Sequence, residues 1–302
     1  MMEFFKSIFY KINASSSALT EHVHLNRMLN AKLLIDQYQK KGIVSNLDEI
    51  EFKVYSQWND DGIIQYLINN IEIPHKTFVE FGVENYTEAN TRFLLMNNNW
   101  SGLIMDGSEA NMNYVKNDSI FWKHDLQCKA VFIDAENVNN LITEAGFDPE
   151  LGILHIDIDG NDYWVWKATT VVNPVIVIIE YNSLFGFDKP WSTPYDPKFY
   201  RTNYHHSNLL YGTSLLSACD LAKEKGYTFV GCNSSGNNAY FVRNDKVGKL
   251  HTPTIEEGYR LSKFKESRDK DGKLTYLRAN QRLASLKGEK VYNTRTNQIE
   301  TI

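Results

Sequence analysis

The stretch "LGILHIDIDGNDYWVWKAT" (151–169) joins a short apolar run to a helical pattern through a polar turn. Its first part, 151–159, is rich in Leu and Ile and is typical of a buried strand. Its second part, 161–169, follows a glycine and places an acid in its first turn, as many helix starts do. The stretch therefore predicts a strand, a turn and a helix, which is the repeating unit of α/β proteins.

The same alternation of strand and helix patterns continues on both sides of this stretch. We expect further strands at 77–82, 101–107, 119–125 and 174–182, separated by helical patterns such as 87–98 and 135–146. Alternation of this kind predicts buried parallel strands covered by helices on both faces.

Two further strand patterns, 227–233 and 238–244, flank the turn "SSGN" and predict an antiparallel hairpin. We therefore predict a Rossmann-like α/β fold. It has a seven-stranded, mostly parallel sheet, a C-terminal antiparallel hairpin and helices on both faces.

The 302 residues suffice for one large α/β domain with additions at its ends. We expect an N-terminal helical extension at 1–55, a main domain at 56–245, and a helical or loose extension at 246–302, helical at 255–268. The apolar residues near the start fall on one helical face, which suits packing on the same domain, on a partner subunit in a homodimer, or on a membrane surface. They are Phe4, Phe5, Ile8, Phe9 and Ile12.

Composition excludes several classes of protein. A net charge of −5 gives no support for nucleic-acid binding. No run approaches the roughly 18 apolar residues of a membrane span. Cys128, Cys219 and Cys232 are odd in number and widely spaced, so they predict no disulfide framework and favour a reducing cytoplasm.

Each predicted parallel strand ends in an acid. Ligands of open α/β sheets bind at the carboxyl ends of the strands, so these acids are candidate site residues. The strand-end residues are Glu80 with Gly82, Asp106 with Gly107, Asp125, Asp157 with Asp159, and Glu180 with Asn182.

The spacing from Gly82 to Asp106 matches that between a glycine turn and a ribose-binding acid. However, Glu84 and Tyr86 stand where a diphosphate needs close approach of the backbone. This disfavours NAD and FAD and suits a nucleoside cofactor without a diphosphate, such as S-adenosylmethionine.

The acids of the turn 157–162 do not form an EF-hand, because Gly160 and Ala168 stand at the wrong loop positions. Alternation along the strand would place Asp157 and Asp159 on one face with His155. Asp162 fits as an acid at a helix N-terminus. Two acids on a buried strand need a partner or a metal ion, so Asp157 and Asp159 are the leading candidates for acid–base or metal chemistry.

Together, "FVEFGVENYTEANTRFLLMNNNWSGLIMDGSE", "WKHDL", "LHIDIDGNDYWVWKA" and "PVIVIIEYNS" resemble the class I S-adenosylmethionine-dependent methyltransferases, and within them the FkbM-type sugar O-methyltransferases. The resemblance covers about 77–182. It implies that 56–245 is a catalytic domain and that the acceptor is a sugar hydroxyl. It further implies a nucleotide-linked sugar for capsule or other surface-glycan synthesis.

The resemblance also implies residue roles. Glu80, Phe81 and Gly82 would border the methionyl part of the cofactor. Asp106 would hold the ribose beside Gly107 and Ser108. Asp125 would lie near the adenine, Asn90 would reach the cofactor carboxylate, and Asp157 would face the sulfonium and the acceptor.

Transfer to a hydroxyl needs a base or a metal ion. Asp157 and Asp159 could take the proton, and so could His205 and His206 of the long loop 183–211. Alternatively, Mg²⁺ or Mn²⁺ could be held by Asp157, Asp159, Glu180 and Asn182. Two competing hypotheses are an NAD(P)-dependent sugar oxidoreductase or epimerase and a non-catalytic binding subunit with the same fold.

Overall fold

A computed structural model describes residues 2–147, 149–278 and 280–302, without the side chains of 2–18 and 20. The chain divides into two compact units, of which the first ends at Gly42 and the second spans Ile43–Ile302. The first unit is one continuous helix, α1 (Met2–Lys41). The apolar side chains predicted to share a face near its start lie outside the described residues. Among the described helices, none is both long enough and apolar enough to cross a membrane.

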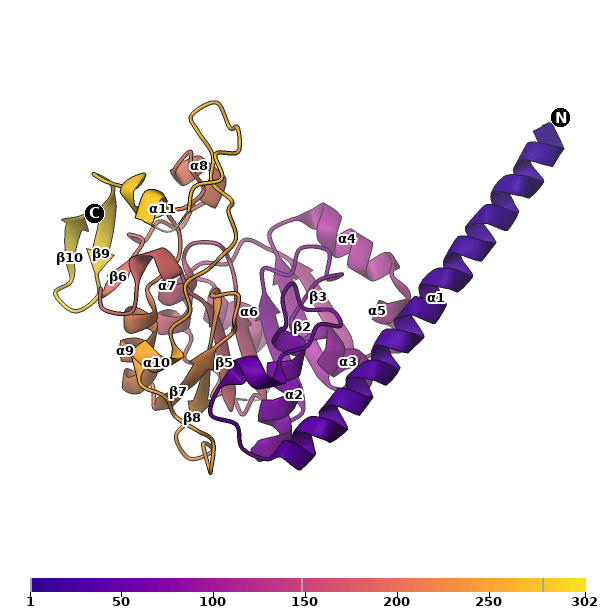
Figure 1. Ribbon diagram of the computed structural model, residues 1–302, viewed down its shortest axis with the longest axis horizontal. Coiled ribbons are helices and arrows are strands. Elements are labelled where there is room, and N and C mark those ends of the chain that lie inside the picture. Colours follow the sequence, from indigo (N-terminus) through magenta and orange to yellow (C-terminus); the bar gives the residue numbers. More distant parts are fainter. Residues whose placement is uncertain (1, 148, 279) are drawn as a thin grey trace. The chain divides into compact units, whose positions relative to one another are not determined.

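The second unit is built on a seven-stranded sheet whose order confirms the predicted Rossmann-like fold (Figure 1). The first five strands of the spatial order run parallel, β8 pairs antiparallel with β5, and β7 pairs antiparallel with β8. In spatial order they are β3 (Leu126–Ala130), β2 (Ser101–Asp106), β1 (Thr77–Phe81), β4 (Ile153–Ile156), β5 (Ile176–Glu180), β8 (Asn238–Arg243) and β7 (Tyr227–Cys232).

Helices flank both faces of this sheet (Figure 1). Both β4 and β5 are buried along their whole length, which explains the continuous Leu, Ile and Val runs of the sequence there. The helices of this unit are α2 (Asp60–Asn70), α3 (Arg92–Asn98), α4 (Glu109–Asn117), α5 (Ser119–Lys123), α6 (Val138–Glu144), α7 (Asp162–Ala168), α8 (Arg201–Tyr204), α9 (Leu215–Glu224), α10 (Ile255–Gly258) and α11 (Asn280–Ala284), with short 3-10 turns at Leu47–Ile50 and Ser183–Phe185.

The strand predicted at 119–125 is wrong. The Asp118 carboxylate accepts a hydrogen bond from the N–H of Ile120 at 3.0 Å and caps α5, so this apolar run is helical. The strand β3 follows it. Asp125 therefore lies at the start of β3, where its carbonyl oxygen accepts from Gly102, and not at the carboxyl end.

The predicted C-terminal extension is partly wrong as well. The helix expected at 255–268 is limited to α10, Ile255–Gly258, and a second short helix, α11, follows at Asn280–Ala284. Near the end of the chain, β9 (Lys290–Asn293) and β10 (Gln298–Thr301) form a hairpin. The hairpin pairs with β6 (Trp191–Ser192) of the long loop, so a small second sheet anchors this segment.

Gly82 fixes how closely β1 approaches β4. Its φ is +74°, and its N–H donates to the carbonyl oxygen of Met105 at 2.9 Å. A Cβ added at Gly82 would lie 1.6 Å from the carbonyl oxygen of Asp157. Only glycine can therefore turn the chain at this point without displacing the end of β4.

We predict that Gly82→Ala lowers the free energy of unfolding by about 2–4 kcal/mol, because a left-handed backbone penalty adds to a backbone clash. Gly226→Ala is the matched control, since Gly226 has φ +84° and nothing within 4 Å of an added Cβ. It should cost about 1 kcal/mol. Urea unfolding of both variants measures the difference, and equal losses would contradict the close approach at Gly82.

Candidate functional site

A cavity of about 700 Å³ opens at the carboxyl ends of the parallel strands. This volume is in the range of small-molecule sites. Its floor comes from the ends of β1, β2, β4 and β5 and from the segment after β3. Its walls include the long loop between β5 and α9, the turn before β8, and Glu266.

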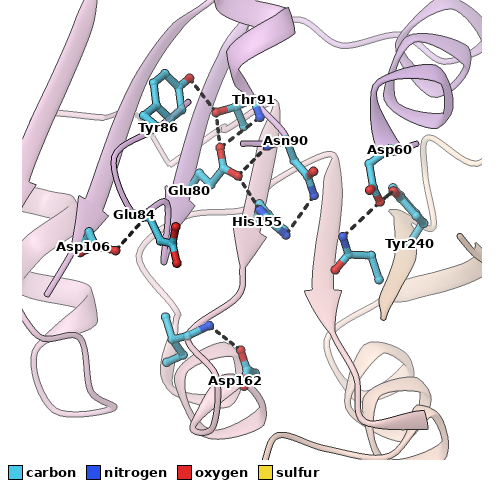
Figure 2. A network of polar contacts seen from close by, with 12 residues as sticks. Asp60, Glu80, Glu84, Tyr86, Asn90, Thr91, Asp106, His155, Asp162 and Tyr240 are labelled. Carbon is cyan, nitrogen blue, oxygen red and sulfur yellow. Dashed lines mark hydrogen bonds and ion pairs between the residues drawn. The ribbon is translucent and has the colours of Figure 1, made fainter. Parts of the chain in front are cut away.

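Glu80 organises the floor of this cavity, as Figure 2 shows. The residue is 2% exposed, yet its carboxylate accepts four hydrogen bonds. Oε1 accepts from the N–H of Asn90 at 2.9 Å and from His155, and Oε2 accepts from the N–H and the hydroxyl of Thr91. A single side chain thus holds β1, the loop before α3, and β4 together.

His155 is the cross-strand neighbour of Glu80 in the β1–β4 pair, which places its Nδ1 2.8 Å from Glu80 Oε1. Burial by itself lowers the pKa of His155, but the hydrogen bond and the charge of Glu80 outweigh it, so the pKa lies above its usual value. Burial likewise raises the pKa of Glu80, and the same pairing reverses this and lowers it. The pairing therefore favours the ionised form of both groups.

The amide nitrogen Nδ2 of Asn90 lies 3.2 Å from Nε2, the second ring nitrogen of His155. An imidazolium donates from both nitrogens, so Asn90 presents its amide oxygen when His155 is protonated and its NH₂ group when His155 is neutral. Asn90 lines the cavity, and its contact with the cofactor carboxylate stays a prediction.

The loop between β1 and α3 is held in an unusual shape. Glu84 and Tyr86 have positive φ values of 47° and 62°. The N–H of Glu84 donates to Asp106 Oδ2 at 2.9 Å, and Arg92 donates to the carbonyl oxygen of Tyr86 at 2.8 Å. The Tyr86 side chain is fully buried and contacts Thr91. Specific partners therefore replace the glycines that such loops often carry.

Asp106 ends β2 and faces the same cavity. Its Oδ1 accepts from the N–H of Ser108 at 2.8 Å, and Ser108 caps α4. Gly107 and Ser108 line the cavity, and Phe132 and Ile133 of the segment after β3 supply an apolar wall. This end of the cavity combines a carboxylate with an apolar surface.

Three carboxylates converge at the other end, where Asp157 and Glu180 line the cavity and the fully buried Asp162 lies behind them. Oxygen atoms of Asp157, Asp162 and Glu180 lie within 4.8 Å of one another. Asp162 accepts from the N–H groups of Ile158 at 2.8 Å and Gly160 at 2.9 Å, so the turn itself carries it inward. We call these three residues the carboxylate cluster.

Burial sets the titration of the carboxylate cluster. Burial, with the nearby Asp159 charge, raises the pKa of Asp157 to about 7. Burial raises the pKa of Asp162 to about 6, although backbone N–H groups act against the rise. Burial and the Asp157 charge raise the pKa of Glu180 well above its usual range. Three carboxylates this close need shared protons or a bound cation.

Asp159 does not lie on the strand with Asp157, contrary to the alternation expected from the sequence. β4 ends at Ile156, and Asp159 has a left-handed φ of 58° that turns it outward. There it pairs with Arg201, whose guanidinium lies 3.8 Å from the centre of the Tyr211 ring. Asp159 lines the cavity through this ion pair rather than through the carboxylate cluster.

Other predicted site residues lie elsewhere. Asn182 donates to the carbonyl oxygens of Leu209 and Tyr211 and accepts from Leu184, so its side chain holds the long loop. Phe81 is wholly buried in the core beneath the sheet. Asp125 is exposed at the start of β3 and does not line the cavity.

The two loop histidines also lie outside the cavity lining. His205 contacts Ser207 and lies 3.5 Å from Glu289, and burial lowers its pKa. His206 is exposed beside it, with ring centres 4.2 Å apart. The structure therefore places neither imidazole beside the carboxylate cluster.

Several lining residues gave little signal in the sequence. The pairing of His155 with Glu80 follows from strand register, which becomes readable once β1 and β4 are known to be neighbours. Arg201 belongs to a loop without periodicity. The other such residues are Asn161, Asn208, Asn237, Asn238 and Glu266.

Comparison with known proteins gave similar solved structures only. No protein-family model matches the chain, and no curated protein matches it. One similar structure is the N-terminal domain of EvdMO1 with SAH bound. The alignment covers 71% of this chain and 93% of that domain, at 11% sequence identity and a TM-score of 0.41. Another is an O-methyltransferase from Bacillus cereus in complex with SAH. That alignment covers 70% of this chain and 90% of the other, at 11% sequence identity and a TM-score of 0.38.

A third structure, an S-adenosylmethionine-dependent methyltransferase from Clostridium acetobutylicum, aligns 61% of this chain with 90% of its own at 11% identity and a TM-score of 0.38. Likenesses this distant say nothing of what this chain binds. Its function has to be argued from the cavity.

We predict that His155→Gln destabilises the protein by about 3 kcal/mol or more at pH 5.5, because it leaves Glu80 buried without its cation. The raised pKa of His155 gives stability that is complete below pH 6.5 and is lost as the pH rises through the folded-state pKa. The loss in the variant should therefore be smaller at pH 9.

Urea unfolding at both pH values measures this loss. The exposed His251→Gln is the control and should match the wild type at both. A loss from His155→Gln that is equal at the two pH values would contradict the buried ion pair.

Proposed function

We propose that this protein is an S-adenosylmethionine-dependent O-methyltransferase that acts on a sugar hydroxyl. The observation that carries the proposal is one continuous cavity with Asp106 and an apolar wall at one end and the carboxylate cluster at the other. The end with Asp106 suits the binding of a nucleoside, and the end with the carboxylate cluster suits the removal of a proton from an acceptor.

The cofactor end fits a nucleoside. Asp106 Oδ2 accepts a single hydrogen bond within the described residues, and a carboxylate oxygen can accept two, so Asp106 can also take a ribose hydroxyl. Phe132 and Ile133 offer apolar surface to a base. The acidic cavity favours a cofactor with a positive sulfonium.

S-adenosylmethionine supplies a methyl group on a positively charged sulfur. Asp157 is the group that we assign to the acceptor proton. Asp157 would take the hydroxyl proton of the acceptor as the acceptor oxygen receives the methyl group and the carbon–sulfur bond breaks. Asp106 and Asn90 would hold and position the cofactor.

The carboxylate cluster also fits a divalent metal ion. Carboxylate oxygens are the ligands that Mg²⁺ and Mn²⁺ prefer, and Glu180 Oε2 is buried without a partner among the described residues. Asp157, Asp162 and Glu180 would hold the ion, in place of the predicted set with Asp159 and Asn182. Such an ion would acidify the acceptor hydroxyl.

Support for a sugar comes from the walls of the acceptor end. Phe199 and Tyr200 offer ring surface, and amide side chains from three segments offer both donors and acceptors. A nucleotide-linked sugar for surface-glycan synthesis, a homodimer and a cytoplasmic location stay predictions from the sequence. The NAD(P) alternative is disfavoured by the buried Tyr86 in the loop after β1, and a fluorescence titration with NADH tests it directly.

We predict that Asp106→Asn weakens S-adenosylmethionine binding about 10–100-fold, because a charge-assisted hydrogen bond to the ribose is lost. Isothermal titration calorimetry measures the affinity. Asp125→Asn is the matched control, since Asp125 lies away from the cavity, and it should bind like the wild type. Absence of binding by the wild type, or equal binding by Asp106→Asn, would refute the cofactor assignment.

We predict that Asp157→Asn lowers kcat by about 10²–10⁴-fold, the usual contribution of a positioned base. Because Asp157 acts ionised and has a pKa of about 7, the wild-type rate should rise with pH through 7 and level off above it. The remaining activity of the variant should lack this rise.

Addition of EDTA during the same assay separates the two roles of the carboxylate cluster. Unchanged activity supports proton transfer without a metal ion, whereas activity lost with EDTA and restored by Mg²⁺ or Mn²⁺ supports the metal site. Activity that survives both Asp157→Asn and EDTA would remove the carboxylate cluster from the mechanism.

A further inference from the structure

Three residues that line the acceptor end keep a buried side-chain oxygen without a hydrogen-bond partner in the described part of the chain. They are Asn161, Glu180 and Asn238, with Oδ1, Oε2 and Oδ1 unpaired. Their residues are only 2%, 6% and 2% exposed. Buried polar atoms in native proteins nearly always have partners, so these oxygens indicate a ligand that donates hydrogen bonds.

The amide orientations are fixed by acceptors on the other side. Asn161 Nδ2 donates to the carbonyl oxygen of Asp196 at 2.8 Å, and Asn238 Nδ2 donates to Asp60 Oδ1 at 3.0 Å. Turning either amide over would place its oxygen against another acceptor oxygen. Both amide oxygens therefore remain acceptors at every pH.

Strand register brings two of these oxygens together. Glu180 ends β5 and is the direct partner of Asn238 in the antiparallel β5–β8 pair. Asn161 precedes α7 on the neighbouring β4 side of the same cavity. The three unpaired oxygens thus come from adjacent elements rather than from scattered positions.

The charge of the cavity also restricts which ligand fits, because it disfavours an anionic one. Its described lining is rich in acids, namely Glu80, Glu84, Glu88, Asp106, Asp157, Asp159, Glu180 and Glu266. The cations of that lining are already engaged. His155 pairs with Glu80, while Arg201 pairs with Asp159 and also donates to the carbonyl oxygen of Asn208 at 2.9 Å.

We propose that the acceptor is a polyhydroxylated ring with several O–H or N–H donors and no anionic group, such as a neutral glycoside or an amino sugar. This rests on the proposed function and narrows its acceptor against phosphorylated and nucleotide-linked sugars. A phosphate group adds no donor for the three oxygens and brings negative charge into a cavity lined by acids, so it is disfavoured. A divalent ion on the carboxylate cluster would bring two positive charges against three negative ones, so the sign would not change.

A matched binding series tests the proposal with the full-length wild type saturated with S-adenosylhomocysteine. The probes are methyl glycosides of glucose, galactose and mannose, their 2-amino analogues, the hexose 1-phosphates, and UDP-glucose. Ligand-observed NMR titration gives the affinities, and methyl transfer with S-adenosylmethionine gives kcat/KM for each probe. Neutral and amino sugars serve as separate arms.

We expect at least one neutral or amino sugar to exceed its phosphate counterpart by about tenfold or more in both measurements. Equal or better binding of a hexose 1-phosphate or UDP-glucose would overturn the proposal, and so would a series in which no sugar binds. Binding of S-adenosylhomocysteine is measured first. If it fails, the proposed function fails, whereas binding of S-adenosylhomocysteine with a preference for phosphates refutes this inference alone.

A variant pair tests the role of charge. Glu266 is exposed on the cavity wall, and Asn208 Nδ2 lies 3.5 Å from its carboxylate. At low salt, Glu266→Gln should raise the affinity for hexose 1-phosphates about threefold relative to the neutral glycosides, because one repelling charge is removed. Glu256→Gln, exposed and outside the cavity, should leave the ratio unchanged. A ratio that Glu266→Gln leaves unmoved would count against the proposal.

Discussion

The buried carboxylate of Glu80 is the constraint on which the rest of the site depends. It lies one residue before the end of β1 and accepts hydrogen bonds from Asn90, Thr91 and His155, which belong to two different elements. A buried carboxylate is stable only with such partners, so the loop after β1 has to fold back over the strand. In that position the loop brings Glu84 to Asp106 and sets the shape of the cofactor end.

A second consequence concerns where negative charge stays unbalanced. Around the cavity, Glu80 is paired with His155, Asp159 with Arg201, and Glu88 with Lys53. The carboxylate cluster has no comparable cation among its described contacts, and burial raises the pKa of each of its members. Perturbed titration that structural pairing does not relieve is typical of functional groups.

The sequence was sufficient for the sheet and for four of its strand-end acids, because parallel strands with helical crossovers bring their carboxyl ends to one edge. The prediction was wrong at β3, because the apolar run after Asp118 forms a helix instead of a strand. Asp125 therefore lies at the start of β3 and not at its carboxyl end. The prediction also failed at Asp159, because the turn needs a left-handed residue there. Asp162 was expected to serve the helix start, and only the folded turn shows that it also joins the carboxylate cluster.

The remaining residues could not be placed from the sequence for a physical reason. The loop that carries Arg201, His205 and His206 has no periodicity, and its course depends on contacts with Asn182, Tyr211 and the distant C-terminal hairpin. Such contacts form between positions far apart in the chain. Composition alone therefore suggested histidine bases, whereas the structure brings an arginine to the cavity.

The central claim is that one cavity holds a nucleoside at Asp106 and a reacting hydroxyl at the carboxylate cluster. A crystal structure with S-adenosylhomocysteine tests it most directly. The account predicts the ribose hydroxyls on Asp106, the base against Phe132 and Ile133, and the thioether sulfur directed toward Asp157. A ligand bound in the opposite direction, or outside this cavity, would contradict it.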